Sequence, residues 1–112
     1  MKSPITTHVL DTSIGRPATN VPARLEQVTE TGSFLLGASA TNADGRITDL
    51  LDVPLETGRY RIVFDTAAYF AERGVPCFYP EVSILFEVTD ASQHHHVPLL
   101  LSPFGYSTYR GS

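Results

Sequence analysis

Three consecutive histidines, His94, His95 and His96, are the residues whose type and spacing point most directly to chemistry. Imidazole titrates near neutral pH, so it can serve as a general base or a general acid. If residues 94–101 form a strand, alternate side chains share a face, which puts His94 and His96 together and His95 on the opposite face. An apolar segment and a further β-favouring run follow, so the histidines are not a purification tag at a polar chain end. We therefore expect a folded C-terminal hairpin that carries functional groups.

Four other residues could contribute to the same chemistry: His8, Arg46, Tyr109 and Ser112. His8 lies in a β-favouring segment and shares a face with Thr6 by alternation, and Arg46 follows an Asp-Gly turn dipeptide. Taken singly, a strand histidine or a loop arginine is usually an ordinary polar residue. If the fold joins them, the guanidinium disfavours a protonated imidazole beside it, and the resulting neutral base would suit hydrolysis.

Three other kinds of site can be weighed against this one. His94, His96 and His8 would supply the three protein ligands of a catalytic zinc site. The charge of Arg46 would oppose that cation and no carboxylate motif supports it, so no metal is expected. A Ser-His-Asp nucleophile lacks a nucleophile elbow or any other local signature. The residues alone leave open a binding module that holds a small molecule in the same groove without reacting.

Composition sets the class of protein. The chain has 112 residues, a hydrophobic content of 42% and a net charge of −4, which fits a single domain over residues 1–112 with a modest core. An acidic chain has no positive field to gather nucleic acid or an anionic membrane, and we expect neither partner. No window approaches the roughly 18 apolar residues of a membrane span. The lone cysteine, Cys77, and the lack of a signal-peptide pattern favour a cytoplasmic location.

The secondary-structure elements that position these residues are predicted to be mostly strands. Periodicity and turn residues indicate strands over residues 5–12, 23–30, 34–41, 47–51, 58–65, 81–88, 94–101 and 106–109, and one helix over 66–73. The strands on either side of Thr31-Gly32-Ser33 should pair antiparallel, and the helix should begin at Asp65 or Thr66 and stop at Gly74. About eight short strands with one short helix predict an all-β, antiparallel β-sandwich. The first and the histidine-bearing strands are expected to meet.

Several segments resemble one known family. They are Thr-His-Val-Leu-Asp-Thr at 7–12, Gly-Arg at 45–46, Phe-Tyr-Pro-Glu-Val at 78–82, His-Val-Pro-Leu-Leu-Leu-Ser-Pro at 96–103 and Tyr-Arg-Gly-Ser at 109–112. Together they resemble the transthyretin-related family of 5-hydroxyisourate hydrolases, and the resemblance covers the whole chain. The terminal tetrapeptide is the most specific motif. His95 stands where a tyrosine is frequent in this family, with its side chain expected to face away from the site.

The resemblance implies an eight-stranded transthyretin-like sandwich that assembles as a homotetramer, with active sites in a channel between dimers. The substrate implied is 5-hydroxyisourate, opened at a cyclic amide bond, with no cofactor. The implied catalytic residues are His8, Arg46, His96 and Ser112, and those implied to bind substrate are His8, Arg46, Tyr109 and Ser112. We expect one histidine of the pair to activate water while Arg46 stabilises the oxyanion.

A non-catalytic transthyretin-like binding protein is the alternative, because the same fold also serves a hormone carrier and fold alone does not decide function. A channel for an apolar aromatic hormone has no need of paired histidines facing an arginine, nor of the terminal Tyr-Arg-Gly-Ser at 109–112. The residues therefore favour the enzyme.

Overall fold

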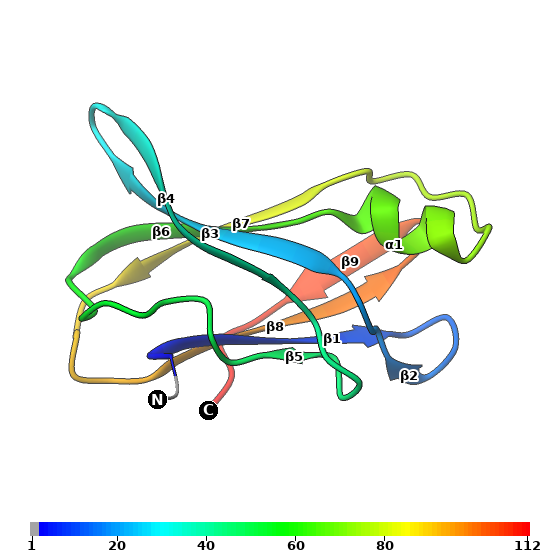
Figure 1. The fold of residues 1–112 in the computed structure, drawn as a ribbon, viewed down its shortest axis with the longest axis horizontal. Coiled ribbons are helices and arrows are strands. Elements are labelled where there is room, and N and C mark those ends of the chain that lie inside the picture. The colour runs from blue at the N-terminus through cyan, green and yellow to red at the C-terminus, as the bar shows by residue number, and fades with distance from the viewer. Residues whose placement is uncertain (1–2) are drawn as a thin grey trace.

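Two β-sheets packed face to face make up the fold, and a short helix lies at one end of the two layers (Figure 1). The structure is a computed structural model that describes residues 3–112. Its elements are β1 (Ile5–Asp11), β2 (Arg16–Pro17), β3 (Pro22–Thr29), β4 (Gly32–Ala40), β5 (Arg46–Ile47), β6 (Gly58–Phe64), α1 (Thr66–Glu72), β7 (Val82–Val88), β8 (His95–Ser102) and β9 (Gly105–Thr108). The all-β sandwich expected from the sequence is confirmed.

The sheet that carries the histidines has the strand order β2-β1-β8-β9, and β5 also pairs with β1; the second sheet has the order β4-β3-β6-β7. Strands β1 and β8 run parallel, from Ile5 opposite His95 to Asp11 opposite Leu101. The other pairings are antiparallel. A parallel pair needs a long connection, and here most of the chain separates β1 from β8. The expected meeting of the first strand with the histidine strand is confirmed.

The core lies between the two sheets and follows the predicted alternation. Tyr60, Ile62 and Phe64 on β6 are all buried, as are Val82 and Val88 on β7. These side chains belong to one cluster that also takes residues from β1, β3, β8 and α1. Removal of their apolar area from water is the main force that holds the two layers together, so the outer face of each sheet is left for other roles.

Helix α1 fastens one end of the sandwich. It begins where the Asp65 carboxylate accepts a hydrogen bond from the Ala68 N–H at 3.0 Å, as the capping pattern predicts. Tyr69 is buried, and its hydroxyl donates to Asp11 Oδ2 at 2.7 Å. Burial, together with this hydrogen bond, raises the pKa of Tyr69 to about 12. The helix thereby ties down the end of β1, the strand that contributes Thr6 and His8.

One predicted strand is shorter than expected. Of residues 47–51, Ile47 alone lies in a strand, β5, which begins one residue earlier, at Arg46. Leu50 and Leu51 are buried without strand pairing. The Leu50 carbonyl packs against Gly37 so closely that a Cβ at Gly37 would collide with it. Core packing of these two leucines therefore replaces the ladder that the β-favouring pattern predicted.

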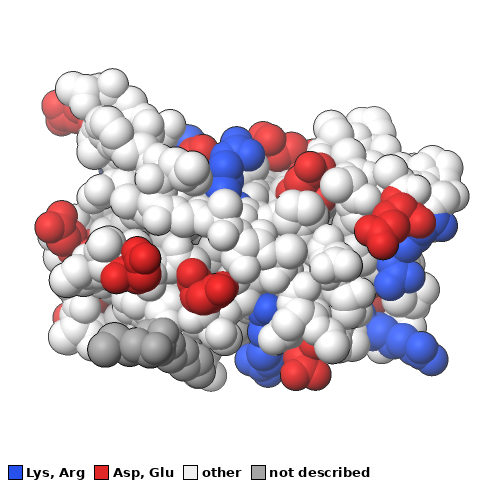
Figure 2. Space-filling model, viewed as in Figure 1, with Lys and Arg blue, Asp and Glu red and all other residues white. Residues whose placement is uncertain are grey.

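On the face shown in Figure 2, acidic side chains are spread from left to right, whereas the basic side chains lie toward the middle and the right, interspersed with acidic ones. Within residues 3–112, no helix is both long enough and apolar enough to cross a membrane.

Candidate active site

The outer face of the histidine-bearing sheet holds a pocket of about 360 Å³. Every residue that lines it is polar: Thr6, Thr7, Arg46, Thr48, His94, His96 and Ser112. They come from four parts of the chain, namely β1, the β5 region, the start of β8 and the C-terminus. The volume lies in the range usual for small-molecule sites, and the lining suits a polar ligand.

The two histidines of the pocket are joined by one hydroxyl group. The parallel register places Thr6 opposite His96. Thr6 Oγ1 lies 2.8 Å from His96 Nδ1 and 3.0 Å from His94 Nε2, both within hydrogen-bonding distance. The two rings are nearly parallel, with centroids 6.3 Å apart. Thr6 is buried and His94 is exposed, so the hydrogen bonds connect a buried hydroxyl group to a solvent-exposed ring.

Arg46 is positioned by a tight turn that lies against β1. Asn42 Oδ1 accepts a hydrogen bond from the Arg46 N–H at 3.0 Å, and the Gly45 carbonyl accepts one from the Val9 N–H at 2.7 Å. Gly45 has φ +73°, and a Cβ there would lie 2.5 Å from the Val9 carbonyl oxygen, so glycine is needed. Across residues 3–112, no carboxylate forms an ion pair with Arg46. Its guanidinium can therefore meet a negative group on a ligand.

The C-terminus folds back onto the pocket. The Gly111 N–H donates to the His96 carbonyl oxygen at 2.9 Å, which forms an isolated bridge beyond the end of β9. Arg110 Nη2 donates to Gln93 Oε1 at 2.8 Å and holds the preceding residue. These contacts bring Ser112 into the pocket with Arg46, and Figure 1 shows the chain end lying beneath the sheet near β1 and β5.

The structure thus brings His96, Arg46 and Ser112 into one pocket and places the two other predicted residues beside it. His8 lies opposite Arg46 in the ladder between β1 and β5, but it does not line the pocket. Tyr109 lines a neighbouring cavity. Strand β9 ends at Thr108, one residue earlier than the sequence predicted, so alternation does not fix the direction of the Tyr109 side chain.

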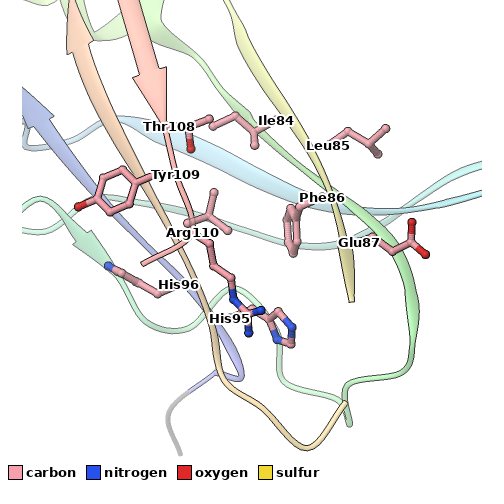
Figure 3. Close-up of a pocket in the computed structure, with 10 residues that line it drawn as sticks. Ile84, Leu85, Phe86, Glu87, His95, His96, Thr108, Tyr109 and Arg110 are labelled. Atoms are coloured by element: carbon pink, nitrogen blue, oxygen red, sulfur yellow. The ribbon is translucent and has the colours of Figure 1, made fainter. Parts of the chain in front are cut away.

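That second cavity, of about 210 Å³, lies between the edge strands β7 and β9 (Figure 3). Its lining consists of Ile84, Leu85, Phe86, Glu87, His95, His96, Val97, Thr108, Tyr109 and Arg110. His96 borders both cavities, whereas His95 is buried and faces the interior, as the alternation predicts. Burial lowers the pKa of His95, and the charge of Arg110 lowers it further. His95 is therefore held as a neutral ring away from the polar pocket.

Sequence reasoning placed His94 on the face of His96 without giving it a role, and it missed the role of Thr6 in the pocket. The sequence signal for Thr6 was the alternation of β1, which places its side chain on the same face as His8. The bond from Thr6 to both rings depends on the parallel register of β1 and β8, which the sequence did not specify. In the described part of the chain, no group of three His, Cys, Asp or Glu side chains is arranged to hold a metal ion.

A two-sheet β-sandwich whose outer face carries a pocket of imidazole, guanidinium and hydroxyl groups is a scaffold for binding or hydrolysing a small polar molecule. The HIUase/Transthyretin family matches residues 5–111, and the chain belongs to this family.

Similar proteins include the 5-hydroxyisourate hydrolase of Mus musculus, which is 47% identical over 113 residues covering 98% of this chain and 96% of the relative. The uric acid degradation bifunctional protein of Arabidopsis thaliana is 48% identical over 126 residues; the match takes in 99% of this chain, which spans 38% of that protein. Among solved structures, Klebsiella pneumoniae 5-hydroxyisourate hydrolase superposes with a TM-score of 0.85 at 40% identity, covering 96% of this chain and 98% of the other. Sea bream transthyretin in complex with thyroxine has a TM-score of 0.90 at 32% identity, covering 96% and 94%.

Proposed function

We propose that this protein hydrolyses 5-hydroxyisourate, opening its six-membered ring at a cyclic amide bond during urate degradation. The observation that carries the proposal is the convergence of His96, Arg46 and Ser112, from three distant parts of the chain, on one all-polar pocket. Relatives from mouse and Klebsiella that bear the name of this hydrolase align over nearly the whole chain and support the choice of substrate.

The reaction requires a base, an oxyanion stabiliser and an acid. In the proposed mechanism His96 accepts a proton from water, and the hydroxide attacks the carbonyl carbon of the ring amide. Arg46 stabilises the charge that develops on the carbonyl oxygen, since its fork of N–H donors faces a pocket that holds no competing carboxylate side chain. The carbon–nitrogen bond then breaks, and the proton held by His96 passes to the departing ring nitrogen.

The remaining site residues position the substrate. Ser112 contributes its hydroxyl to the same pocket as Arg46. His8 lies beside Arg46 and is placed to orient the attacking water or to share the acid role. Tyr109, with 58% of its surface exposed, is available to cover the substrate from the side of the second cavity. The mechanism uses no metal or cofactor.

A direct test adds freshly generated 5-hydroxyisourate to the protein and follows the decay of its absorbance against the spontaneous rate. Catalysed decay that scales with protein concentration is expected. Decay at the spontaneous rate, with a protein that is folded by circular dichroism, would leave the proposal without support.

A carrier function is the second candidate, favoured by the close superposition with thyroxine-bound sea bream transthyretin. That ligand is a large aromatic molecule, whereas each of the seven residues lining this pocket is polar. A carrier would bind its ligand stoichiometrically and leave it unchanged. Titration with thyroxine, run beside the hydrolysis assay, separates the two functions.

We also propose that residues 1–112 form a single domain that acts as a homotetramer in the cytoplasm. The common core between the two sheets supports a single domain, and the lone free cysteine, Cys77, fits a reducing compartment. Strands β7 and β9 are sheet edges, which need a partner or cover, and a facing copy would enclose the open pocket. Sedimentation velocity should show one species of four chains.

A further inference from the structure

We propose that Thr6 is a positioning residue which, together with His94, holds His96 in the tautomer that carries its proton on Nδ1. The effect of this tautomer on catalysis rests on the proposed hydrolytic function. The tautomer itself can be observed without any reaction.

The hydroxyl of Thr6 makes two hydrogen bonds and can be the donor in only one of them. Its Oγ1 lies 2.8 Å from His96 Nδ1 and 3.0 Å from His94 Nε2. A hydroxyl has one proton to donate and lone pairs to accept. With neutral rings, Thr6 either donates to one histidine and accepts from the other or accepts from both, but it cannot donate to both. When Thr6 donates to one ring, the facing nitrogen of that ring is unprotonated, so the protonation of the two rings is coupled through one oxygen atom.

Only one of the two directions makes His96 a base toward the pocket. A neutral imidazole has one protonated and one unprotonated nitrogen. If His96 Nδ1–H donates to Thr6, and Thr6 donates to His94 Nε2, the lone pair of His96 is on Nε2. With the opposite direction, Nε2 carries the proton and His96 cannot accept one from water. Base catalysis thus requires Thr6 to accept from His96 Nδ1, and a His94 Nε2 that accepts the Thr6 proton favours this direction.

The fold protects this arrangement. Thr6 is 2% exposed, so little water can compete for its hydroxyl. The parallel ladder fixes Thr6 directly opposite His96, and the adjacent Thr7 uses its own hydroxyl elsewhere, on the Val97 carbonyl at 2.6 Å. When His96 takes up a proton from water, both of its nitrogens carry hydrogen, and Thr6 continues to accept from Nδ1. The same bond therefore serves the resting base and the imidazolium that follows.

The test combines ¹⁵N NMR of the histidine rings with steady-state kinetics. In the wild type, at a pH where His96 is neutral, the two-bond correlations should identify Nδ1 as its protonated nitrogen. Thr6→Val keeps the shape but removes the hydroxyl, and His94→Ala removes the final acceptor at an exposed position. Both should lose the strict Nδ1–H preference. Both should lower kcat by on the order of ten- to a hundredfold, as for other partners that orient a functional imidazole, with KM changed about twofold or less.

Thr6→Ser should restore the tautomer and most of kcat. Thr41→Val is the matched control, because Thr41 is also buried and its hydroxyl also makes two hydrogen bonds, to the Ala18 carbonyl and from the Val21 N–H. This control should lower the melting temperature and leave the His96 tautomer and kcat unchanged.

Each outcome is decisive. A wild-type His96 protonated on Nε2, or an unchanged tautomer in Thr6→Val and His94→Ala, overturns the inference whatever the rates. If Thr6→Val does not fold, His94→Ala carries the same test. If the tautomer shifts as expected but the wild type does not accelerate 5-hydroxyisourate decay, the positioning role stands and the proposed function fails.

Discussion

The Gly111 N–H donates a hydrogen bond to the His96 carbonyl oxygen at 2.9 Å, and the same glycine lies against the His96 ring. A Cβ at Gly111 would lie 2.5 Å from His96 Cδ2 and 3.2 Å from Pro98 Cγ. The chain end therefore crosses directly over the imidazole, and only glycine leaves room for it. One contact couples the position of the His96 ring to the placement of Ser112.

We expect Gly111→Ala to lower hydrolysis at least tenfold while the melting temperature changes little. The added methyl group must displace either the His96 ring or the chain end, and small misplacements near reacting groups are costly. Gly105→Ala is the control, since its Cβ would meet only Ser102 Oγ at an ordinary 3.7 Å. Equal rates in the two variants would show that the tight contact has no catalytic consequence.

Substitution of Arg46 tests electrostatic stabilisation. Arg46→Ala should reduce kcat by on the order of a hundred- to a thousandfold, the usual effect of removing one donor to an oxyanion. Arg46→Lys keeps the charge but loses the planar fork, so we expect it to recover only part of the loss. Stability should be unaffected, because Arg46 is exposed and forms no ion pair with a carboxylate in the described part of the chain. Full activity in a folded Arg46→Ala protein would remove Arg46 from the site.

His96 and His8 should contribute unequally to the rate of hydrolysis. His96→Ala should lose on the order of a hundred- to ten-thousandfold in rate, as expected for a general base. His8→Ala should lose less, because His8 lies beside Arg46 but does not line the pocket. Rates and thermal melts measured together decide the order. A larger loss in His8→Ala at equal stability would assign the base to His8 instead.

The sequence predicted the architecture well because alternation and turn residues are local signals. The inward faces of β6 and β7, the hairpin of β3 and β4 and the cap at Asp65 all follow from them. The extent of β5 did not, since Leu50 and Leu51 are buried in the common core, where the Leu50 carbonyl packs against Gly37 of β4.

The site could be predicted only in part. His96, Arg46 and Ser112 were candidates from their residue types, a family resemblance implied that they share a site, and the structure places them in one pocket. The bridge formed by Thr6 needed the parallel register between β1 and β8, which joins residues 90 positions apart. No local pattern carries such a register, and the same holds for the crossing of Gly111 over the imidazole.

Tyr69→Phe should lower the free energy of unfolding by about 1–3 kcal/mol, because it removes a donor from the buried Asp11 carboxylate. The pKa of Tyr69 is raised to about 12 in the folded protein, above the ordinary value near 10. The neutral phenol is therefore favoured by folding, and this contribution is complete below pH ~10 and is lost as the pH rises toward 12. Urea unfolding of both proteins between neutral and alkaline pH should show the difference shrinking in that window. A constant difference would contradict the assigned bond.

Changes at the C-terminus separate the position of the His96 ring from the groups that Ser112 supplies. Deleting Ser112 alone keeps the Gly111–His96 hydrogen bond, whereas deleting residues 111–112 removes it. We expect the first deletion to impair substrate binding, seen mainly as a raised KM, and the second to lower kcat as well. Neither should unfold the protein, since little apolar area is lost with these residues.

A C-terminal extension should be as damaging as the deletion of Ser112, because it directs further backbone into a space of about 360 Å³. An N-terminal extension of the same sequence and length is the control, because the described N-terminal residues lie outside the pocket lining until Thr6. The assay compares all four proteins with the wild type at matched protein concentration. If the C-terminally extended protein keeps the wild-type kcat and KM, Ser112 is not part of the site, and the pocket must bind its substrate through Arg46 and the histidines alone.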